Sequence, residues 1–460
     1  MMRRPYRILA PCGILGYGFP DTSFEQALAA GVDAIVVDAG STDAGPHKLG
    51  AGVAIVSKRA YKKDLGRMVT AAKKLGVPCL VGSAGGSGAK KHVNWTLDVL
   101  REIAADEGFS LRVCVIWADI PNEVILEAIN TGDVKGMSSN VPALTAQALE
   151  ATNGVVAQMG YEPILEALRG DPDVIICGRA YDPAPFAAVG VLNGFDPALC
   201  LHMGKILECG ALCAQPGTTK DCIIGELHDD HFIIRSPNPQ RRVTALSVAA
   251  HTFYEKDHPY LLQGPGFVLD LSQCSYEQLD ELSVKVSGST IKQVPYEIKL
   301  EGAALDAYRT FVLAGIRDQV VIERLVEIEE SVKESVAAQF ADIDPTQYSI
   351  HFTNYGINGV MGALEPEIPA PGRPYEVGVL MDVVANTQVL ASTICSAARS
   401  TFVHYGFEGR KCTAGNLAFA FAPSDVEFGP VYKFSVYHLM RVEDGCRCFP
   451  QEWMRIGEGD

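Results

Sequence analysis

Cys79-Leu-Val-Gly-Ser-Ala-Gly-Gly-Ser-Gly88 is the stretch that decides the fold class of this chain. A short apolar run, typical of a buried strand, leads directly into a glycine-rich loop. The same order recurs at residues 34–46 and 174–183. Because loops at the carboxyl ends of parallel strands converge on one edge of an open α/β sheet, we expect the three loops to meet. Glycine lets backbone N–H groups approach an anion, so this edge is predicted to bind a small anionic substrate.

Strand-like and helical segments alternate over residues 1–217. Short, nearly continuous apolar strands between helices are typical of a mostly parallel sheet with helices on both faces. We therefore predict a Rossmann-like α/β domain that carries the glycine-rich loops. Its expected strands are 7–11, 34–38, 78–82, 113–117 and 174–177, and its expected helices include 62–75, 93–107 and 121–130.

The pattern changes after residue 217. Residues 218–294 are predicted to form a β-rich connecting region, in which 242–249 is one strand. Residues 295–425 give a strand, a long helix over 304–340, two strands, a helix and a strand. This order is that of a ferredoxin-like α+β domain. Residues 426–460 are expected to form a C-terminal strand pair and tail.

Composition restricts the classes of function. The chain has 460 residues and a formal net charge of -16, which disfavours a nucleic-acid partner because phosphate contacts need a basic face. No apolar run approaches the roughly 20 residues of a membrane-spanning helix. Thirteen cysteines, several of them in apolar strands, fit reduced thiols in a cytoplasmic protein. Exposed sheet edges lead us to expect a homo-oligomer.

Acidic side chains near strand and helix ends are candidates for proton transfer. Asp38 and Asp43 could act as bases or orient a substrate hydroxyl. The alternative is a structural role, in which each aspartate caps a helix N-terminus or forms an Asx-turn. Glu208, among apolar neighbours, could have a raised pKa and act as a general acid. His404 is a complementary acid–base candidate or a helix cap. Cys209 is a nucleophile candidate, with a buried inert thiol as the alternative.

A second group of residues is predicted to bind the substrate. Arg179 could hold a carboxylate with two hydrogen bonds, or pair with Asp182 and brace its loop. Loop 82–88 lacks the sequence patterns of nucleotide-binding loops, so its predicted ligand is a carboxylate or phosphate group and not ATP or a dinucleotide. The alternative is that its glycines only allow the strand and the following helix to pack closely. The predicted substrate-binding residues are Ser41, Gly82, Ser83, Gly85, Gly86, Arg179, Asp182, Asn386 and Asn416.

No metal or separate cofactor is expected. The segment from His228 to His231 contains two histidines and two aspartates, but its position between two strands favours a hairpin turn over a metal site. CoA is considered only as part of a thioester substrate.

Several motifs together resemble those of the acyclic terpene utilisation AtuA family. They are Asp38-Ala-Gly-Ser-Thr-Asp43, Gly82-Ser-Ala-Gly-Gly86, Gly178-Arg179 with Asp182, Glu208-Cys-Gly210, Tyr355-Gly-Ile-Asn-Gly-Val-Met-Gly362 and Thr413-Ala-Gly-Asn-Leu417. The resemblance implies an α/β domain followed by a ferredoxin-like one. It also implies a role in catabolism of acyclic terpenes and related branched acids through CoA thioesters, without assigning any catalytic residue.

The residues and the resemblance together lead us to expect a lyase of the hydro-lyase or hydratase type. Its substrate would be a small organic acid or the CoA thioester of one. Two alternatives stay open at this point. One is a hydrolase or acyl transferase that uses Cys209. The other is a non-catalytic binding or scaffold subunit of a catabolic complex.

Overall fold

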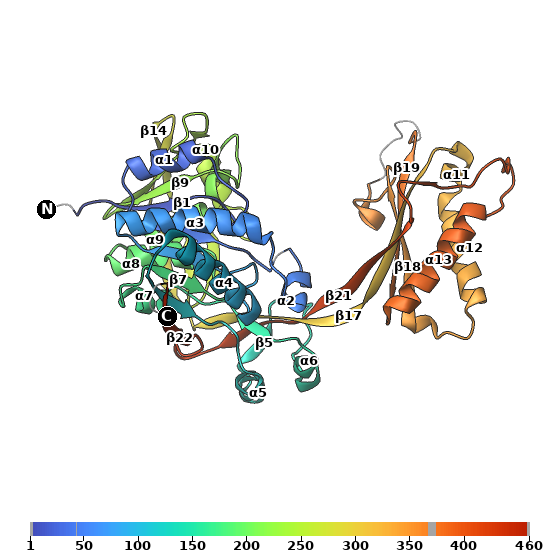
Figure 1. Cartoon of the computed structure of the whole chain (residues 1–460), viewed down its shortest axis with the longest axis horizontal. Coiled ribbons are helices and arrows are strands. Elements are labelled where there is room, and N and C mark those ends of the chain that lie inside the picture. Colours follow the sequence, from blue (N-terminus) through green and yellow to red (C-terminus); the bar gives the residue numbers. More distant parts are fainter. Residues whose placement is uncertain (1–2, 43, 367–373, 458–460) are drawn as a thin grey trace. The chain divides into compact units, whose positions relative to one another are not determined.

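A computed structural model of the protein describes residues 3–42, 44–366 and 374–457. The chain divides into two compact units (Figure 1). Unit 1 comprises Met1–Ala304 and Lys433–Asp460, and unit 2 comprises Leu305–Tyr432. The division into four segments with boundaries at 217, 294 and 425 stays a prediction.

In the part of unit 1 that the structure describes, ten strands form one mixed sheet, in the order β14-β15-β10-β9-β1-β2-β3-β7-β4-β22. The five consecutive strands from β1 to β4 in this order run parallel to one another. They are β1 (Tyr6–Ala10), β2 (Ala34–Asp38), β3 (Cys79–Gly82), β7 (Val174–Cys177) and β4 (Leu111–Ile116). All five lie within two residues of their predicted positions.

The flanking strands of this sheet are antiparallel. They are β9 (Ile223–Leu227), β10 (His231–Arg235), β14 (Ser275–Asp280), β15 (Ser283–Ser287) and β22 (Gln451–Ile456). The expected mostly parallel sheet is therefore not confirmed, because residues beyond 217 add five antiparallel strands to the parallel centre. The sequence placed those residues in a separate region, since periodicity does not show which sheet a strand joins.

Helices cover both faces of the sheet. Along β1 and β2, Leu9, Ile35 and Val37 belong to one core cluster, whereas Ile8 and Val36 belong to another. Alternate residues of a strand point to opposite faces, so each cluster is one helical layer. The first layer contains α1 (Asp21–Ala29), α3 (Lys58–Leu75) and α4 (Lys90–Glu107), the last two in front of the sheet in Figure 1. The second contains α7 (Glu162–Leu168), α8 (Ala184–Leu192) and α9 (Pro197–Leu207).

Smaller elements complete unit 1. One small sheet contains β12 (Leu261–Gly264), β13 (Phe267–Asp270) and β16 (Thr290–Gln293), and β8 (Ala214–Gln215) pairs with β11 (Arg242–Val243). β6 (Val155–Ala157) pairs with the start of β17 (Glu297–Ile316), and β5 (Val134–Gly136) with the end of β21 (Asp425–Arg441). The short helices are α2 (His47–Ala51), α5 (Asn122–Thr131), α6 (Ala146–Glu150), α10 (Ala245–Thr252) and the 3-10 helix η1 (Gly210–Cys213).

The strand expected at 242–249 is wrong beyond its first two residues. Thr244 and Ser247 form a reciprocal capping box that starts α10. Side-chain capping supplies partners for backbone N–H groups at a helix start, so it favours a helix over continued strand pairing here.

Unit 2 has its own core. Its elements are the second part of β17, α11 (Gln319–Glu323), α12 (Leu325–Gln339), η2 (Pro345–Gln347), β18 (Tyr348–Tyr355), η3 (Gly362–Leu364), β19 (Val377–Ala385), α13 (Gln388–His404), β20 (Ala418–Phe419) and the first part of β21. The strand order is β18-β19-β17-β21. Val312, Ile328, Val383 and Phe402 lie at the centre of the core.

The long helix expected over 304–340 is wrong in its first third. β17 continues to Ile316 and pairs with β19 along nine residues. Val312, Ala314 and Ile316 alternate as buried residues, which is the period of a strand. Pairing along the whole of β19 outweighs the helix propensity of the alanines near residue 304. The strand expected at 414–420 is also reduced to β20, and β21 is the last strand of this sheet.

No helix in the described parts of the chain combines the length and apolar character needed to cross a membrane.

Candidate functional site

The loops after β2, β3 and β7 lie together at one edge of the sheet. Asp38 is in register with Gly82, and the amide of Ala84 donates to Cys177 O at 3.0 Å. A Cβ at Gly40 would lie 2.3 Å from Gly86 O, and a Cβ at Gly88 would lie 2.1 Å from Arg179 N. Glycine is therefore required where these loops touch. We call this region the strand-edge cluster and define it by Asp38, Arg179, Asp182, Glu208 and Glu301.

Several backbone amides of the glycine-rich loop after β3 already donate hydrogen bonds to other groups of the protein. Gly86 N donates to Ser83 O at 3.1 Å, and Gly85 N donates to the Tyr61 hydroxyl at 3.3 Å. Ser83 has a positive φ of 45°, and its buried Oγ accepts hydrogen bonds from Arg179 and from Ala180 N. These contacts fix the loop against its neighbours, as the packing alternative describes.

Arg179 is buried at the centre of the cluster, with 1 % of its surface exposed. Its Nε donates to Glu301 Oε2 at 2.8 Å, and Nη1 donates to Asp182 Oδ1 at 2.9 Å and to Ser83 Oγ at 3.1 Å. The ion pair with Asp182 is the arrangement considered above as the alternative to substrate binding. Arg179 therefore connects Asp182 and Glu301 and braces its own loop.

Glu301 on β17 is a member that the sequence analysis did not identify. It is fully buried and accepts hydrogen bonds from Arg179, from Thr42 at 2.7 Å and from Lys299 at 2.8 Å. Burial alone would raise its pKa, but the charges of Arg179 and Lys299 lower it to about 2. No motif marks this glutamate, because only the pairing of β17 with β6 brings it to the cluster.

Asp38 lies at the end of β2 and is 6 % exposed. Within the described structure, its Oδ1 is buried and has no hydrogen-bond partner. Burial, followed by the charge of Asp182, raises the pKa of Asp38 well above its usual value, while the charge of Arg179 opposes the shift. The carboxyl group is therefore protonated far more readily than a surface aspartate.

Glu208 caps the C-terminus of α9 and has a similar environment. Its Oε1 accepts a hydrogen bond from Lys205, one turn earlier on the helix. Oε2 is buried and has no partner among the described residues. Burial raises the pKa of Glu208 to about 7; the charge of Lys205 lowers it and that of Asp182 raises it. Asp38, Asp182 and Glu208 are thus close enough to influence one another electrostatically.

Cys209 follows Glu208 and is half-buried. Burial and then the charge of Glu208 raise the pKa of its thiol. A thiol with a raised pKa is a poor nucleophile at neutral pH. Ser41 is half-buried in the loop after β2, and Asp43 lies outside the described residues.

The remaining candidates lie in unit 2. The Asn416 amide nitrogen donates to Phe402 O at 2.9 Å and to Tyr405 O at 3.0 Å, which caps the end of α13. His404 lies in the last turn of the same helix. Asn386 is exposed just before α13, and its backbone amide donates to Gln347 O. These three residues belong to unit 2, whereas the strand-edge cluster belongs to unit 1.

The two-histidine segment is a hairpin between β9 and β10, as expected. His228 N donates to His231 O at 2.9 Å, and the His228 ring forms a hydrogen bond with Glu226. In the described regions no group of three or more His, Cys, Asp or Glu side chains is arranged to hold a metal ion.

Comparison with known proteins gives one family. A model described as "Acyclic terpene utilisation family protein AtuA" matches residues 7–416. Comparisons with curated proteins and with solved structures gave no match. The matched range contains Asp38, Arg179, Glu208 and Glu301, and it extends through most of unit 2. Since the match covers far more than half of the sequence, this protein belongs to the acyclic terpene utilisation AtuA family, and membership implies a role in that process.

Proposed function

We propose that this protein is a lyase of the hydro-lyase type acting on a small organic acid or its CoA thioester. One observation carries the proposal. Asp38 and Glu208 are two buried carboxyl groups at the carboxyl edge of the parallel centre of the mixed sheet, and each has one oxygen with no partner among the described residues. Such groups are unfavourable for folding, and they are a common feature of catalytic sites.

The chemistry requires one base and one acid. Removal of water from a 3-hydroxy acid breaks a C–H bond next to the carbonyl and a C–O bond, and it forms a C=C bond. The base takes the proton, and the acid gives a proton to the departing hydroxyl, which leaves as water. No oxidant or reductant is needed. We assign Glu208 as the base, because its pKa of about 7 suits proton transfer near neutral pH.

Asp38 is assigned as the acid. Its raised pKa keeps a proton on the carboxyl group, and the nearby charge of Asp182 supports this state. The assignment follows the rule that two interacting carboxyl groups divide into one that is protonated and one that is ionised. Arg179 is proposed as a positioning residue, because its donors hold Asp182, Glu301 and Ser83.

We extend the proposal to the rest of the molecule. Unit 2 is proposed to be a ferredoxin-like domain, on the support of its strand order and its strand–helix–strand–strand–helix–strand sequence. A cytoplasmic location is supported by thirteen cysteines that are all free in the structure. A homo-oligomer formed through exposed sheet edges remains part of the same proposal.

The test is turnover in D₂O. The protein is incubated with short-chain 3-hydroxy acids, their α,β-unsaturated counterparts and the CoA thioesters of both, and mass spectrometry follows water exchange and deuterium incorporation. Wild-type protein should convert at least one pair. Glu208→Gln and Asp38→Asn should each reduce the rate by about 100-fold or more.

The control is Glu329→Gln. Glu329 is a buried carboxyl in unit 2 whose pKa is raised by burial, and it bonds to the Asn354 amide. This variant should keep the wild-type rate. If no member of the panel reacts, the lyase proposal is wrong. If the wild type reacts and both cluster variants keep full activity, the assignment of Asp38 and Glu208 is wrong.

A further inference from the structure

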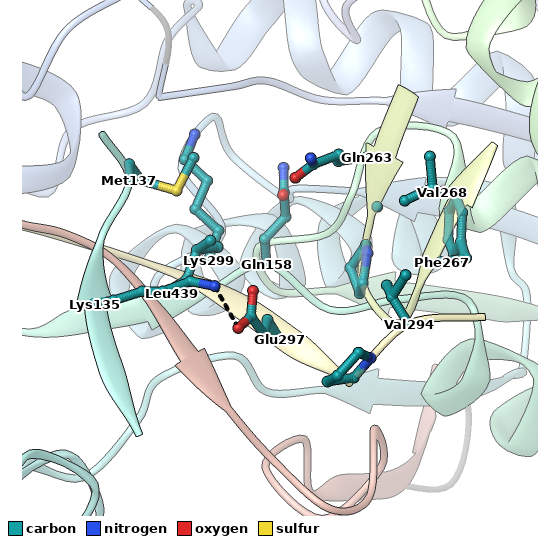
Figure 2. A pocket seen from close by; sticks show the side chains of 13 residues that line it. Lys135, Met137, Gln158, Gln263, Phe267, Val268, Val294, Glu297, Lys299 and Leu439 are labelled. Carbon is teal, nitrogen blue, oxygen red and sulfur yellow. Dashed lines mark hydrogen bonds and ion pairs between the residues drawn. The ribbon is translucent and has the colours of Figure 1, made fainter. Parts of the chain in front are cut away.

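Unit 1 contains a cavity of about 380 Å³ outside the strand-edge cluster (Figure 2). One wall comes from β12, β13 and the segment after β16, with Gln263, Phe267, Val268 and Val294. The opposite wall comes from β5, the start of β17, the end of β21 and the segment after β6. The cavity therefore lies between the three-stranded sheet and the unit 1 end of the sheet that contains β5, β17 and β21, and none of the described residues that line it is in a strand of the ten-stranded sheet.

One end of the cavity contains two lysines, Lys135 and Lys299, each of which is paired with a glutamate. Lys299 points into it from β17, and its side chain is 13 % exposed. Burial alone would lower the pKa of Lys299, but the charge of Glu301 raises it, so the ammonium group stays charged. Within the described chain, the Lys299 ammonium group contacts Glu301 at 2.8 Å and the Tyr437 ring at 4.6 Å. An ammonium group has three N–H donors, so it retains capacity for a further acceptor.

A neutral donor lies beside this lysine. The Gln158 side chain lies between those of Lys299 and Gln263 (Figure 2), and the Gln158 backbone is fixed by a 2.9 Å hydrogen bond from Gln158 N to Lys299 O. Its side chain is one of those that line the cavity. At the mouth, Lys135 is 62 % exposed and is paired with Glu297 at 2.7 Å, so Lys299 is the inner cation.

The other end is apolar. Phe267, Val268 and Val294 lie together on the side opposite Lys299 in Figure 2. Phe267 is buried, and its ring packs edge-on against Tyr181 at a centroid distance of 6.0 Å. This wall can contact hydrocarbon and cannot donate hydrogen bonds from its side chains. A volume of this size is within the range of small-molecule sites.

We propose that this cavity is a binding site for a short-chain monocarboxylate. Lys299 and the Gln158 amide hold the carboxylate, and Phe267, Val268 and Val294 contact the hydrocarbon part. A dicarboxylate is disfavoured, because its second charge would lie against the apolar wall without a partner. The proposal goes beyond the lyase function, since neither Asp38 nor Glu208 lines the cavity.

The test is calorimetric titration of the full-length protein with 4-methylpentanoate, with 4-methylpentanamide as an uncharged ligand of matched shape. The acid should bind and the amide should bind at least about tenfold more weakly, since a charge-assisted hydrogen bond is worth more than a neutral one. Turnover is not part of this measurement, so the result is independent of the lyase proposal.

Two variants locate the site. Lys299→Gln should weaken binding of the acid by about tenfold or more, and it leaves Glu301 bonded to Arg179 and Thr42. Val268→Phe fills the cavity from a half-buried position and should abolish binding. Lys73→Gln is the matched control, because Lys73 forms a similar 2.8 Å pair with Asp173 on the surface. Circular dichroism checks that each variant is folded.

Loss of binding in both cavity variants with retention in Lys73→Gln supports the site. Three results would overturn it: no binding of 4-methylpentanoate by the wild type, equal binding of acid and amide, or wild-type affinity in folded Lys299→Gln and Val268→Phe.

Discussion

The sheet edge of unit 1 and the end of α13 in unit 2 both contain side chains that were predicted to act on the substrate, but the two regions differ in how completely these side chains are hydrogen-bonded. At the sheet edge, Asp38 and Glu208 are buried and each leaves a carboxyl oxygen without a partner in the described chain. At the end of α13, the Asn416 amide bonds to two helix carbonyls and its oxygen accepts from Arg410.

The two regions differ in the environment of their polar side chains more than in the types of residue that they contain. Burial raises the pKa values of Asp38 and Glu208, so the folded protein keeps charged or titrating groups in an unfavourable environment. Asn416, in contrast, satisfies the carbonyls that every helix end leaves open. Buried polar atoms that lack a hydrogen-bond partner therefore distinguish the candidate site from a structural helix cap. The number of motif residues in a region does so less well.

The largest expected effect concerns the ion pairs of the two units. Arg179→Ala should lower the free energy of unfolding by about 3–5 kcal/mol, because it leaves Glu301 buried without its main cation. Arg309→Ala removes a half-exposed pair with Asp382 in unit 2 and should cost about 1 kcal/mol or less. Urea unfolding of both variants measures the two changes.

Equal losses for Arg179→Ala and Arg309→Ala would contradict the view that unit 1 depends on its buried charges.

The second expected effect is a pH dependence that belongs to unit 1. The pKa of Glu208 is about 7 in the folded protein and about 4.3 in an unfolded chain. Between these values the folded state holds a proton that the unfolded state has released. The contribution to stability is therefore fully present below about pH 4.3 and is lost as the pH rises through 7.

Glu208→Gln removes this contribution. The difference in unfolding free energy between wild type and variant should change by about 3 kcal/mol from pH 4.3 to pH 8, in favour of the variant at high pH. Urea unfolding at several pH values measures it. Parallel curves for the two proteins would show that Glu208 titrates normally, and the contrast with the satisfied groups of α13 would then fail.

Sequence alone predicted the parallel centre of unit 1 well. Each of its strands is a short apolar run with a turn signal at its end, as in Cys79 to Gly82 and Val174 to Cys177, so local pattern and tertiary position agree. Pattern failed where pairing is non-local. β17 contains several alanines and was assigned partly to a helix, because its partner β19 lies some 70 residues away in sequence.

The same reason limits prediction of the candidate site. Asp38, Arg179, Asp182 and Glu208 stand beside recognisable loops or helix ends, and the structure brings these four together. Glu301 and Lys205 have no such marker. The pairing of β17 with β6 brings Glu301 to the cluster. Lys205 reaches Glu208 because the two residues lie one helical turn apart. The sequence shows that Lys205 and Glu208 have the i, i+3 spacing of a helical ion pair, but it does not show that the pair is buried.

The smallest expected effect tests whether the end of α13 is only structural. Asn416→Ala removes two hydrogen bonds to helix carbonyls and should destabilise this turn by about 1 kcal/mol. Asn386→Ala should stay within about 0.5 kcal/mol, because that side chain is exposed. Amide hydrogen exchange in the last turn of α13 measures both, and only Asn416→Ala should accelerate it. If Asn416→Ala instead leaves exchange unchanged and reduces turnover, this asparagine acts on substrate and the contrast between the two regions is wrong.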